Sequence, residues 1–409
     1  MLAAIAEGQT TIRNYSPGAD CASTLRCLGS LGVAVSRRPI QSESDQPSEE
    51  LVIEGRGLRG LQSPHETLDA GNSGSTIRML SGLLAGHPFA SSITGDESLQ
   101  RRPMKRVIEP LTQMGAHFRA RDQNYPPLRV EGTAALHGIH YRVPVASAQV
   151  KSAILMAGLL ADGETSVTEP VQTRDHTEIA FQEFGAEIFR GRKTTTVQGG
   201  HALKAAKLNV PGDLSSAAFF LCAALLFPAS DLYLQDVGLN PTRTALLDFL
   251  SGMGAEIKIL NIGEASGELI GDIHVTGRSL RGGTIEGEMV AALIDEIPVL
   301  AVLGTQTEGG LILRNAEELR LKESDRIATT ADNLRRMGAT VEVRPDGFDI
   351  PGRQQLKGAE LDSFGDHRIA MAFTVAALAA KGESILHDSK AASVSFPDYF
   401  EHLEKITER

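Results

Sequence analysis

Residues 147–168 read SAQVKSAILMAGLLADGETSVT, and this stretch holds one copy of a pattern that recurs along the chain. A polar motif comes first, an apolar segment rich in small residues follows, and a glycine separates it from a short segment with β-branched residues. The apolar segment is typical of a helix, and the segment after the glycine is typical of a strand. The stretch therefore predicts a helix with polar groups at its N-terminus, followed by a strand.

The same pattern occurs six times along the chain of 409 residues. The helical and strand segments of the six copies are 1–6 and 10–12, 79–85 and 90–93, 154–161 and 165–167, 219–227 and 232–234, 299–303 and 311–313, and 373–380 and 384–386. A second predicted helix follows most copies and ends at a glycine. These glycines, 69 to 84 residues apart, are Gly32, Gly115, Gly185, Gly254 and Gly338. Each repeat is thus a whole supersecondary unit, longer than a solenoid module.

Six repeats in a chain of this length favour an α/β protein with two domains of three repeats each. The predicted joint lies near Pro211, halfway along the chain. We therefore predict an N-terminal domain at residues 1–210 and a C-terminal domain at residues 211–409. A polar stretch at residues 41–50 is predicted to be a loop.

Five of the six copies open with a polar motif, at residues 71–76, 147–151, 211–216, 294–296 and 365–368. Serine, asparagine and aspartate are the residues that cap helix N-termini, so capping explains most of these motifs. Capping does not explain Gln149, which is not a preferred N-cap residue. It does not explain Lys151, His367 and Arg368 either, because cations oppose the helix dipole at this end. Several helix N-termini with added cations predict a site for a ligand that carries several negative charges.

The composition restricts the possible partners. A net charge of −11 argues against nucleic acid or an acidic membrane surface. The longest apolar run, residues 217–227, is too short to cross a bilayer. The three cysteines, Cys21, Cys27 and Cys222, lack the spacing of a metal site and favour a reducing compartment. These features favour a cytoplasmic protein that binds small anions. We also expect it to be a monomer and to use no metal or cofactor.

Seven motifs resemble those of the 5-enolpyruvylshikimate-3-phosphate synthase family, in the order in which that family carries them. They lie at residues 68–74, 95–99 with 101–104, 147–153, 173–178, 211–213, 321–326 and 366–368. The resemblance covers nearly the whole chain and implies an inside-out α/β barrel of six βαβαββ units in two domains. It also implies transfer of the enolpyruvyl group of phosphoenolpyruvate to the 5-hydroxyl of shikimate 3-phosphate, with release of phosphate. This reaction belongs to the shikimate pathway of chorismate and aromatic amino acid biosynthesis and is the target of glyphosate.

The resemblance also implies roles for single residues. Asp295 accepts the proton of the substrate hydroxyl, and Glu323 donates a proton to the methylene carbon of phosphoenolpyruvate. The residues implied for binding phosphoenolpyruvate are Asn72, Gly74, Arg102, Gln149, Arg326 and Arg368. Those implied for shikimate 3-phosphate are Ser147, Ala148, Gln149, Arg174, Asp295 and Lys322. An alternative for Glu323 and Arg326 is a simple ion pair, because they are three residues apart on a predicted helix.

Two other functions remain open at this point. The sister enolpyruvyl transferase that acts on UDP-N-acetylglucosamine shares the fold and the donor, but it usually carries a reactive cysteine in the loop that corresponds to residues 94–103. This loop contains no cysteine here. The second alternative is a truncated anion-binding protein without turnover. In the family, a leader with three substrate-binding side chains precedes the helix that starts here at Met1, so the resemblance leads us to expect weak turnover from this form.

Overall fold

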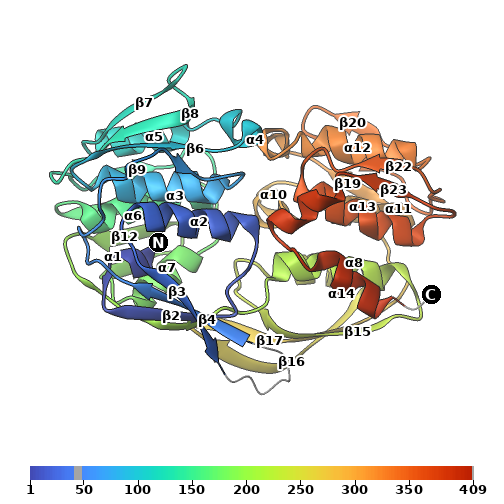
Figure 1. Cartoon of the computed structure of the whole chain (residues 1–409). Helices are drawn as coiled ribbons and strands as arrows, with labels where there is room; N and C mark the ends of the chain where they lie inside the picture. The colour runs from blue at the N-terminus through green and yellow to red at the C-terminus, as the bar shows by residue number, and fades with distance from the viewer. Residues whose placement is uncertain (41–47, 408–409) are drawn as a thin grey trace. The chain divides into compact units, whose positions relative to one another are not determined.

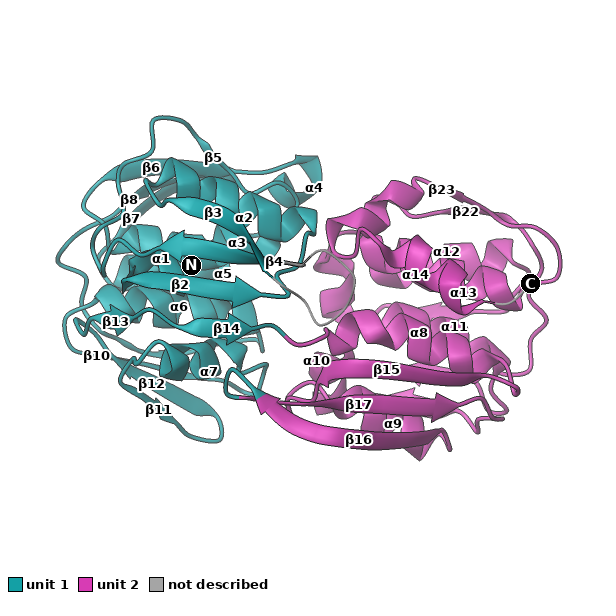
Figure 2. Ribbon diagram, turned by 60° about the horizontal axis from the view of Figure 1, so that its bottom comes forward, with its two compact units in different colours: residues 1–210, 265–267 teal, residues 211–264, 268–409 magenta. Residues whose placement is uncertain are grey.

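The computed structural model describes residues 1–40 and 48–407. Most of the predicted loop at residues 41–50 lies outside the described residues. The chain divides into two compact units (Figure 2). Unit 1 comprises Met1–Val210 and Ala265–Gly267, and unit 2 comprises Pro211–Glu264 and Glu268–Arg409.

Helices and strands alternate along unit 1 (Figure 1). Its helices are α1 (Leu2–Ile5), α2 (Ala19–Ser30), α3 (Gly74–Ala85), α4 (Glu97–Gln100), α5 (Lys105–Gln113), α6 (Ala148–Leu160) and α7 (His176–Glu183). Its strands are β1 (Ala6–Glu7), β2 (Gln9–Arg13), β3 (Val35–Ile40), β4 (Ser48–Glu54), β5 (Leu68–Asp69), β6 (Ala90–Thr94), β7 (His117–Arg121), β8 (Tyr125–Glu131), β9 (His140–Arg142), β10 (Glu164–Thr168), β11 (Ile188–Arg190), β12 (Thr194–Gln198), β13 (Leu203–Lys204) and β14 (Lys207–Asn209).

Three sheets of unit 1 repeat one strand order. In the orders β5-β6-β8-β7 and β9-β10-β12-β11, the strand before the first helix runs parallel to the strand after it, and the next strands run antiparallel. In the third sheet, β14-β2-β4-β3, β14 takes the place of the parallel strand. A crossover between parallel strands needs a helix. Each polar motif of these crossovers therefore lies between a strand end and a helix start.

Unit 2 continues the same alternation. Its helices are α8 (Leu214–Leu226), α9 (Ala245–Gly252), α10 (Glu288–Leu293), α11 (Ile297–Gln306), η1 (Glu317–Leu321), α12 (Arg326–Arg336), α13 (His367–Ala379), η2 (Ser389–Val394) and α14 (Tyr399–Ile406). Its strands are β15 (Asp231–Gly238), β16 (Glu256–Ala265), β17 (Glu268–Thr276), β18 (Gly283–Ile285), β19 (Leu311–Leu313), β20 (Glu342–Arg344), β21 (Gly347–Ile350), β22 (Glu360–Asp362) and β23 (Ile385–His387). The order β18-β19-β21-β20 repeats that of unit 1, β15-β17-β16 forms a second sheet, and β22 pairs in parallel with β23.

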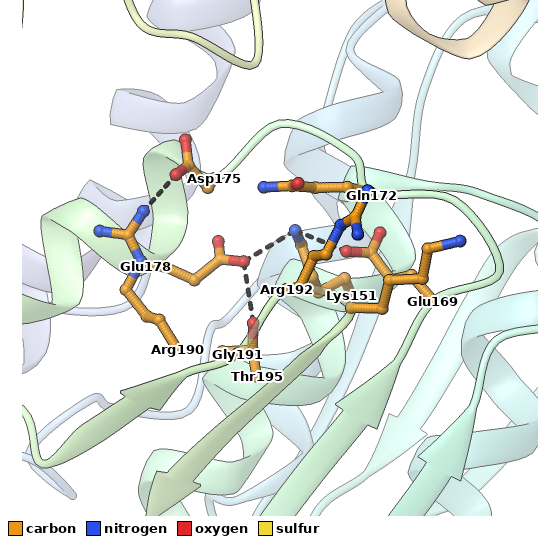
Figure 3. A pocket seen from close by; sticks show the side chains of 10 residues that line it. Lys151, Glu169, Gln172, Asp175, Glu178, Arg190, Gly191, Arg192 and Thr195 are labelled. Carbon is orange, nitrogen blue, oxygen red and sulfur yellow. Dashed lines mark hydrogen bonds and ion pairs between the residues drawn. The ribbon is translucent and has the colours of Figure 1, made fainter. Parts of the chain in front are cut away.

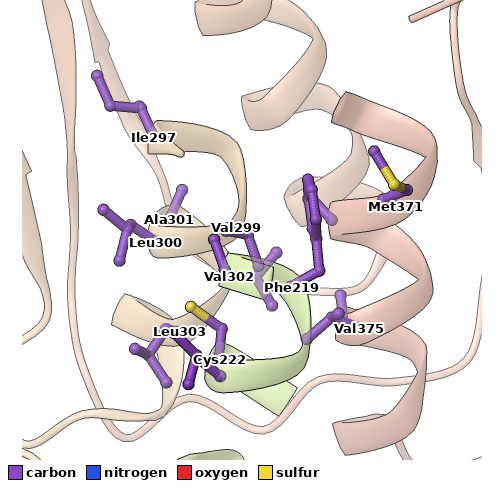
Figure 4. Close-up of a cluster of buried hydrophobic side chains, with 14 of the residues drawn as sticks. Phe219, Cys222, Ile297, Val299, Leu300, Ala301, Val302, Leu303, Met371 and Val375 are labelled. Carbon is purple, nitrogen blue, oxygen red and sulfur yellow. The ribbon is translucent and has the colours of Figure 1, made fainter. Parts of the chain in front are cut away.

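The first helix of each repeat is the central one. In unit 2, α8, α11 and α13 pack against one another, and Phe219, Val299 and Val375 from these three helices meet in one core (Figure 4). These helices are apolar on almost every side, which is the pattern of a fully buried helix rather than of a surface helix. In unit 1, α3 and α6 pack together in the same way.

The glycines that end the second helices of the repeats have a conformational reason. Gly115 follows α5 with a φ of 110°, and Gly254 follows α9 with a φ of 102°. A left-handed residue at this position lets the chain leave the helix, and only glycine adopts it without steric cost. The repeat predicted from the sequence is thus present in the structure. No helix within residues 1–40 and 48–407 is long and apolar enough to cross a membrane.

Candidate active site

The polar motif before α3 forms a tight turn at the start of that helix. Gly71 has a φ of 58°, and its amide donates to Asp69 Oδ1 at 2.8 Å. The hydroxyl of Ser73 then accepts from the amide of Thr76 at 3.1 Å and caps α3. The turn places Asn72 and Gly74 at the helix N-terminus, where backbone N–H groups favour an anion.

Three of the residues predicted to bind phosphoenolpyruvate lie together at this end of α3. Arg102 is 5% exposed, and its Nη2 donates to Asn72 Oδ1 at 2.8 Å. Asn72 in turn donates to Asp96 Oδ2 at 2.6 Å. A Cβ atom added at Gly74 would lie 3.2 Å from Arg102 Nη1, so the guanidinium passes close to the helix start.

Arg78 belongs to the same group, although it was not among the residues predicted from the sequence. Its Nη1 donates to Gln149 Oε1 at 2.7 Å, and Gln149 Nε2 donates to Ser75 Oγ at 2.8 Å. These bonds bring Gln149, the fourth phosphoenolpyruvate residue predicted in this unit, next to the start of α3. A signal was available: Arg78 lies four residues after Gly74 and therefore on the same face of the helix.

The residues predicted to bind shikimate 3-phosphate in unit 1 lie on two segments. Ser147 caps α6 by accepting from the amide of Val150 at 3.4 Å, so Ala148 and Gln149 form the first turn of that helix. Arg174 lies on the segment before α7, whose first residue is His176. Helices α6 and α7 are linked by the hydroxyls of Ser152 and Thr177, which are 2.6 Å apart.

Lys151 does not have the role predicted from the sequence. We expected a cation at a helix start to face an anionic ligand, but the Lys151 side chain is 1% exposed and lies between two glutamates. Its Nζ is 2.9 Å from Glu169 Oε2 and 2.7 Å from Glu178 Oε1. The helix start tolerates this cation because two carboxylates, rather than a ligand, compensate its charge.

In unit 2, the side chain of Arg326 at the start of α12 contacts three carboxylates. Its Nη2 donates to Glu323 Oε2 at 2.6 Å, and its Nη1 lies 3.3 Å from Asp295 Oδ1. Its Nε and Nη2 donate to the two oxygens of Asp366 at 2.8 and 3.1 Å. Lys322 Nζ approaches the same oxygen of Asp295 at 3.5 Å. The structure thus brings both predicted proton carriers, Asp295 and Glu323, to one guanidinium.

Electrostatics keeps this cluster charged. Burial alone would lower the pKa of Arg326, but Asp366, Glu323 and Asp295 raise it above its usual value. Burial alone would raise the pKa of Asp366, but Arg326 beside it holds that pKa below its usual range. The Arg326–Asp366 pair is therefore ionised at neutral pH. The ion pair between Glu323 and Arg326, the alternative offered by the sequence, is present, although Glu323 lies before the start of α12 rather than on that helix.

Arg368 stands at the start of α13 and is oriented by a different group. Its Nη1 donates to the hydroxyl and the carbonyl oxygen of Ser215 at 2.7 and 3.1 Å. The hydroxyl of Ser215 donates to Glu296, and the Arg368 guanidinium lies over the ring of Phe219 at 5.8 Å. Asp366 links the two arginines, since it binds the side chain of Arg326 and accepts from the backbone amide of Arg368 at 2.9 Å.

The side chain of His367 should make the stability of the folded chain depend on pH. Burial, with a contribution from Arg368, lowers its pKa from 6.5 to about 4, against the opposite effect of Asp366. Between about pH 6.5 and 4 the unfolded chain therefore binds more protons than the folded chain, and stability falls as the pH falls through this window. We expect His367→Asn to reduce the loss of melting temperature between pH 7 and pH 5. An unchanged loss would contradict this, and the exposed His402→Asn variant is the control.

Comparison with known proteins identifies the family of the chain. Residues 1–403 match the family model described as EPSP synthase (3-phosphoshikimate 1-carboxyvinyltransferase). A 3-phosphoshikimate 1-carboxyvinyltransferase of Solibacter usitatus is 56% identical over 408 residues, which are 100% of this chain and 93% of the relative. One of Koribacter versatilis is 50% identical with the same coverage.

Solved structures give the fold directly. An EPSP synthase from Acinetobacter baumannii superposes with a TM-score of 0.84 at 40% identity, covering 99% of this chain and 92% of that one. This confirms the predicted fold class, a two-domain enolpyruvyl transferase fold. By sequence along residues 1–403 and by fold, the chain belongs to the EPSP synthase family.

Proposed function

We propose that this chain transfers the enolpyruvyl group of phosphoenolpyruvate to the 5-hydroxyl of shikimate 3-phosphate and releases phosphate. The observation that carries the proposal is that Asp295 and Glu323 contact the same guanidinium, at 3.3 and 2.6 Å. The family match supports the choice of substrates. Transfer to UDP-N-acetylglucosamine is not favoured, because residues 94–103 contain no cysteine and the relatives carry the 3-phosphoshikimate name.

Formation of the tetrahedral adduct requires two proton transfers. The 5-hydroxyl loses its proton to Asp295 as its oxygen attacks C2 of phosphoenolpyruvate, and Glu323 protonates C3 to give a methyl group. The C–O bond to phosphate then breaks, the leaving phosphate takes up the proton held by Asp295, and one methyl proton returns to the Glu323 carboxylate, which restores the carbon–carbon double bond. Arginine forks neutralise the phosphate and carboxylate charges of the substrates in this scheme.

Arg326 connects the binding of phosphoenolpyruvate to the proton transfer by Glu323. In the structure four of its N–H donors bond to carboxylates. In our proposal, a phosphoenolpyruvate anion that binds Arg326 displaces Glu323 as a partner. A carboxylate that loses its cation takes up a proton more readily. In our proposal, donor binding thus prepares Glu323 to act as an acid.

The remaining site residues have binding roles in this proposal. We assign Asn72, Gly74, Arg102, Gln149, Arg326 and Arg368 to phosphoenolpyruvate, and Ser147, Ala148, Gln149, Arg174, Asp295 and Lys322 to shikimate 3-phosphate. The hydrogen bonds that link Asn72 to Arg102 and Gln149 to Arg78 support the first set. The cap of α6 by Ser147 supports the second. We also propose that the protein is a monomer and that it is located in the cytoplasm. The reducing conditions of that compartment suit the three free cysteines.

The test of the function is a comparison of acceptors. Phosphate release from phosphoenolpyruvate is measured with shikimate 3-phosphate and, separately, with UDP-N-acetylglucosamine. We expect release with the first acceptor only. The proposal would be contradicted by phosphate release with UDP-N-acetylglucosamine alone. It would also be contradicted if phosphoenolpyruvate and shikimate 3-phosphate both bind without release of phosphate.

Substitution at Gly74 tests the donor site. The added Cβ of Gly74→Ala would lie 2.6 Å from Arg78 Nη1 and 3.2 Å from Arg102 Nη1, so both side chains have to move. Loss of a hydrogen bond to a charged group costs about 1.5–3 kcal/mol, so we expect the KM for phosphoenolpyruvate to rise about tenfold or more. Gly29→Ala, where an added Cβ meets open space, is the control. An unchanged KM in Gly74→Ala would remove Gly74 from the donor site.

A further inference from the structure

The buried ion cluster around Lys151 lies beside an open space in unit 1. The side chains of Lys151, Glu169 and Glu178 are 1%, 4% and 3% exposed. One ammonium and two carboxylates leave a net negative charge, and a buried ionic cluster is weak evidence for stability. A cavity of about 460 Å³ adjoins the three side chains (Figure 3). On the side that faces the cavity, close packing therefore cannot hold the neighbouring backbone in place. Polar contacts have to hold it instead.

These contacts hold both neighbours of Arg174. Immediately before it, the hydroxyl of Thr173 donates to Glu169 Oε1, while the other oxygen of Glu169 binds Lys151. Immediately after it, Asp175 pairs with Arg190 of β11, as Figure 3 shows. The backbone on each side of Arg174 is thus tied to a charged partner.

The same cluster is anchored in α6. Lys151 lies one turn after Ser147, the residue that caps this helix, and it reaches Glu178 in the first half of α7 as well as Glu169. The hydroxyls of Ser152 and Thr177 add a second link between α6 and α7. The start of α6 and the segment that carries Arg174 are therefore joined through buried and partly buried polar contacts.

We propose that Lys151, acting through Glu169 and Thr173, positions Arg174 against the start of α6 so that both segments bind the phosphate of shikimate 3-phosphate. The inference rests on the proposed function, which assigns Arg174, Ser147 and Ala148 to that substrate. Lys151 is a positioning residue, because its ammonium contacts the two glutamates. An arginine that is already held in place loses less conformational freedom on binding, so positioning raises affinity.

The test removes the link at Thr173 and leaves the buried charges in place. Thr173→Val deletes the hydroxyl that donates to Glu169 and keeps a side chain of similar shape. We expect the Kd for shikimate 3-phosphate, measured by calorimetry on the full chain, to rise about tenfold. The control is Thr195→Val, which deletes a hydroxyl that donates to Glu178 Oε1 at 3.2 Å from β12, outside the Arg174 segment. We expect its Kd to stay within about twofold of the wild type.

A double-mutant cycle separates positioning from a general structural effect. If Thr173 acts through Arg174, Thr173→Val should not weaken binding further in an Arg174→Ala background. Equal effects of Thr173→Val in both backgrounds, or no effect in either, would overturn the inference. Because affinity is measured without turnover, a wild type that binds shikimate 3-phosphate without releasing phosphate would overturn the proposed function alone. A wild type that does not bind it would overturn both.

Discussion

Replacing Arg326 by methionine is expected to lower the free energy of unfolding of unit 2 by about 3–5 kcal/mol. The Arg326 side chain is 1% exposed, and its removal leaves Asp366, which is fully buried, without its cation. Glu323 and Asp295 lose the same partner. Uncompensated charge in a buried position is far more costly than the loss of a surface pair. Urea denaturation, followed by fluorescence or circular dichroism, measures the change.

A matched control for this experiment lies in the same unit. Lys405 pairs with Glu401 at 2.7 Å on α14, with both side chains about 60% exposed. We expect Lys405→Met to change the free energy of unfolding by less than about 1 kcal/mol. If Arg326→Met is as stable as Lys405→Met, the cluster of three carboxylates around Arg326 is not formed in the protein.

Replacing Glu323 by glutamine is expected to lower kcat by a factor of about 10² to 10⁴. The amide has nearly the same shape and retains an oxygen that can accept from Arg326, but it cannot deliver a proton to carbon. Binding of both substrates should therefore persist while turnover is lost. Asp295→Asn should lower kcat similarly, because an amide cannot take the proton of the 5-hydroxyl.

The control for these variants is Glu317→Gln, an exposed change in η1 a few residues before Glu323. We expect it to leave kcat within about twofold of the wild type. Single-turnover kinetics with saturating substrates separate binding from chemistry. Near-normal turnover of Glu323→Gln would show that another group protonates the donor.

The repeats were predictable from the sequence because local signals mark them. The apolar helices, the glycines at their ends and the capping residues Ser73, Ser147, Asp213 and Asp366 all have short-range causes. In the motif before α11, Glu296 holds the cap position without a side-chain capping bond, and Asp295 beside it pairs with Arg326. A polar motif that lacks the capping bond found in the other motifs is a useful indication of a catalytic or binding role.

Contacts between distant segments could not be read from the sequence. Asp366 is 40 residues from Arg326, and Ser215 is 153 residues from Arg368, so no local spacing joins these pairs. The prediction for Lys151 was wrong for the same reason, since Glu169 and Glu178 reach it from other elements. The roles of single residues in binding and catalysis stay predictions, which the variants described above test.

The proton transfer assigned to Glu323 can be measured in the wild-type product. The proposed reaction adds a proton exchanged with solvent to the methylene carbon of phosphoenolpyruvate, and this carbon becomes a freely rotating methyl group in the adduct. Elimination then removes any one of its three hydrogens. With phosphoenolpyruvate and shikimate 3-phosphate in D₂O, mass spectrometry should find deuterium in the methylene group of the enolpyruvyl product. Enolpyruvyl product that carries no deuterium at this carbon would contradict the account.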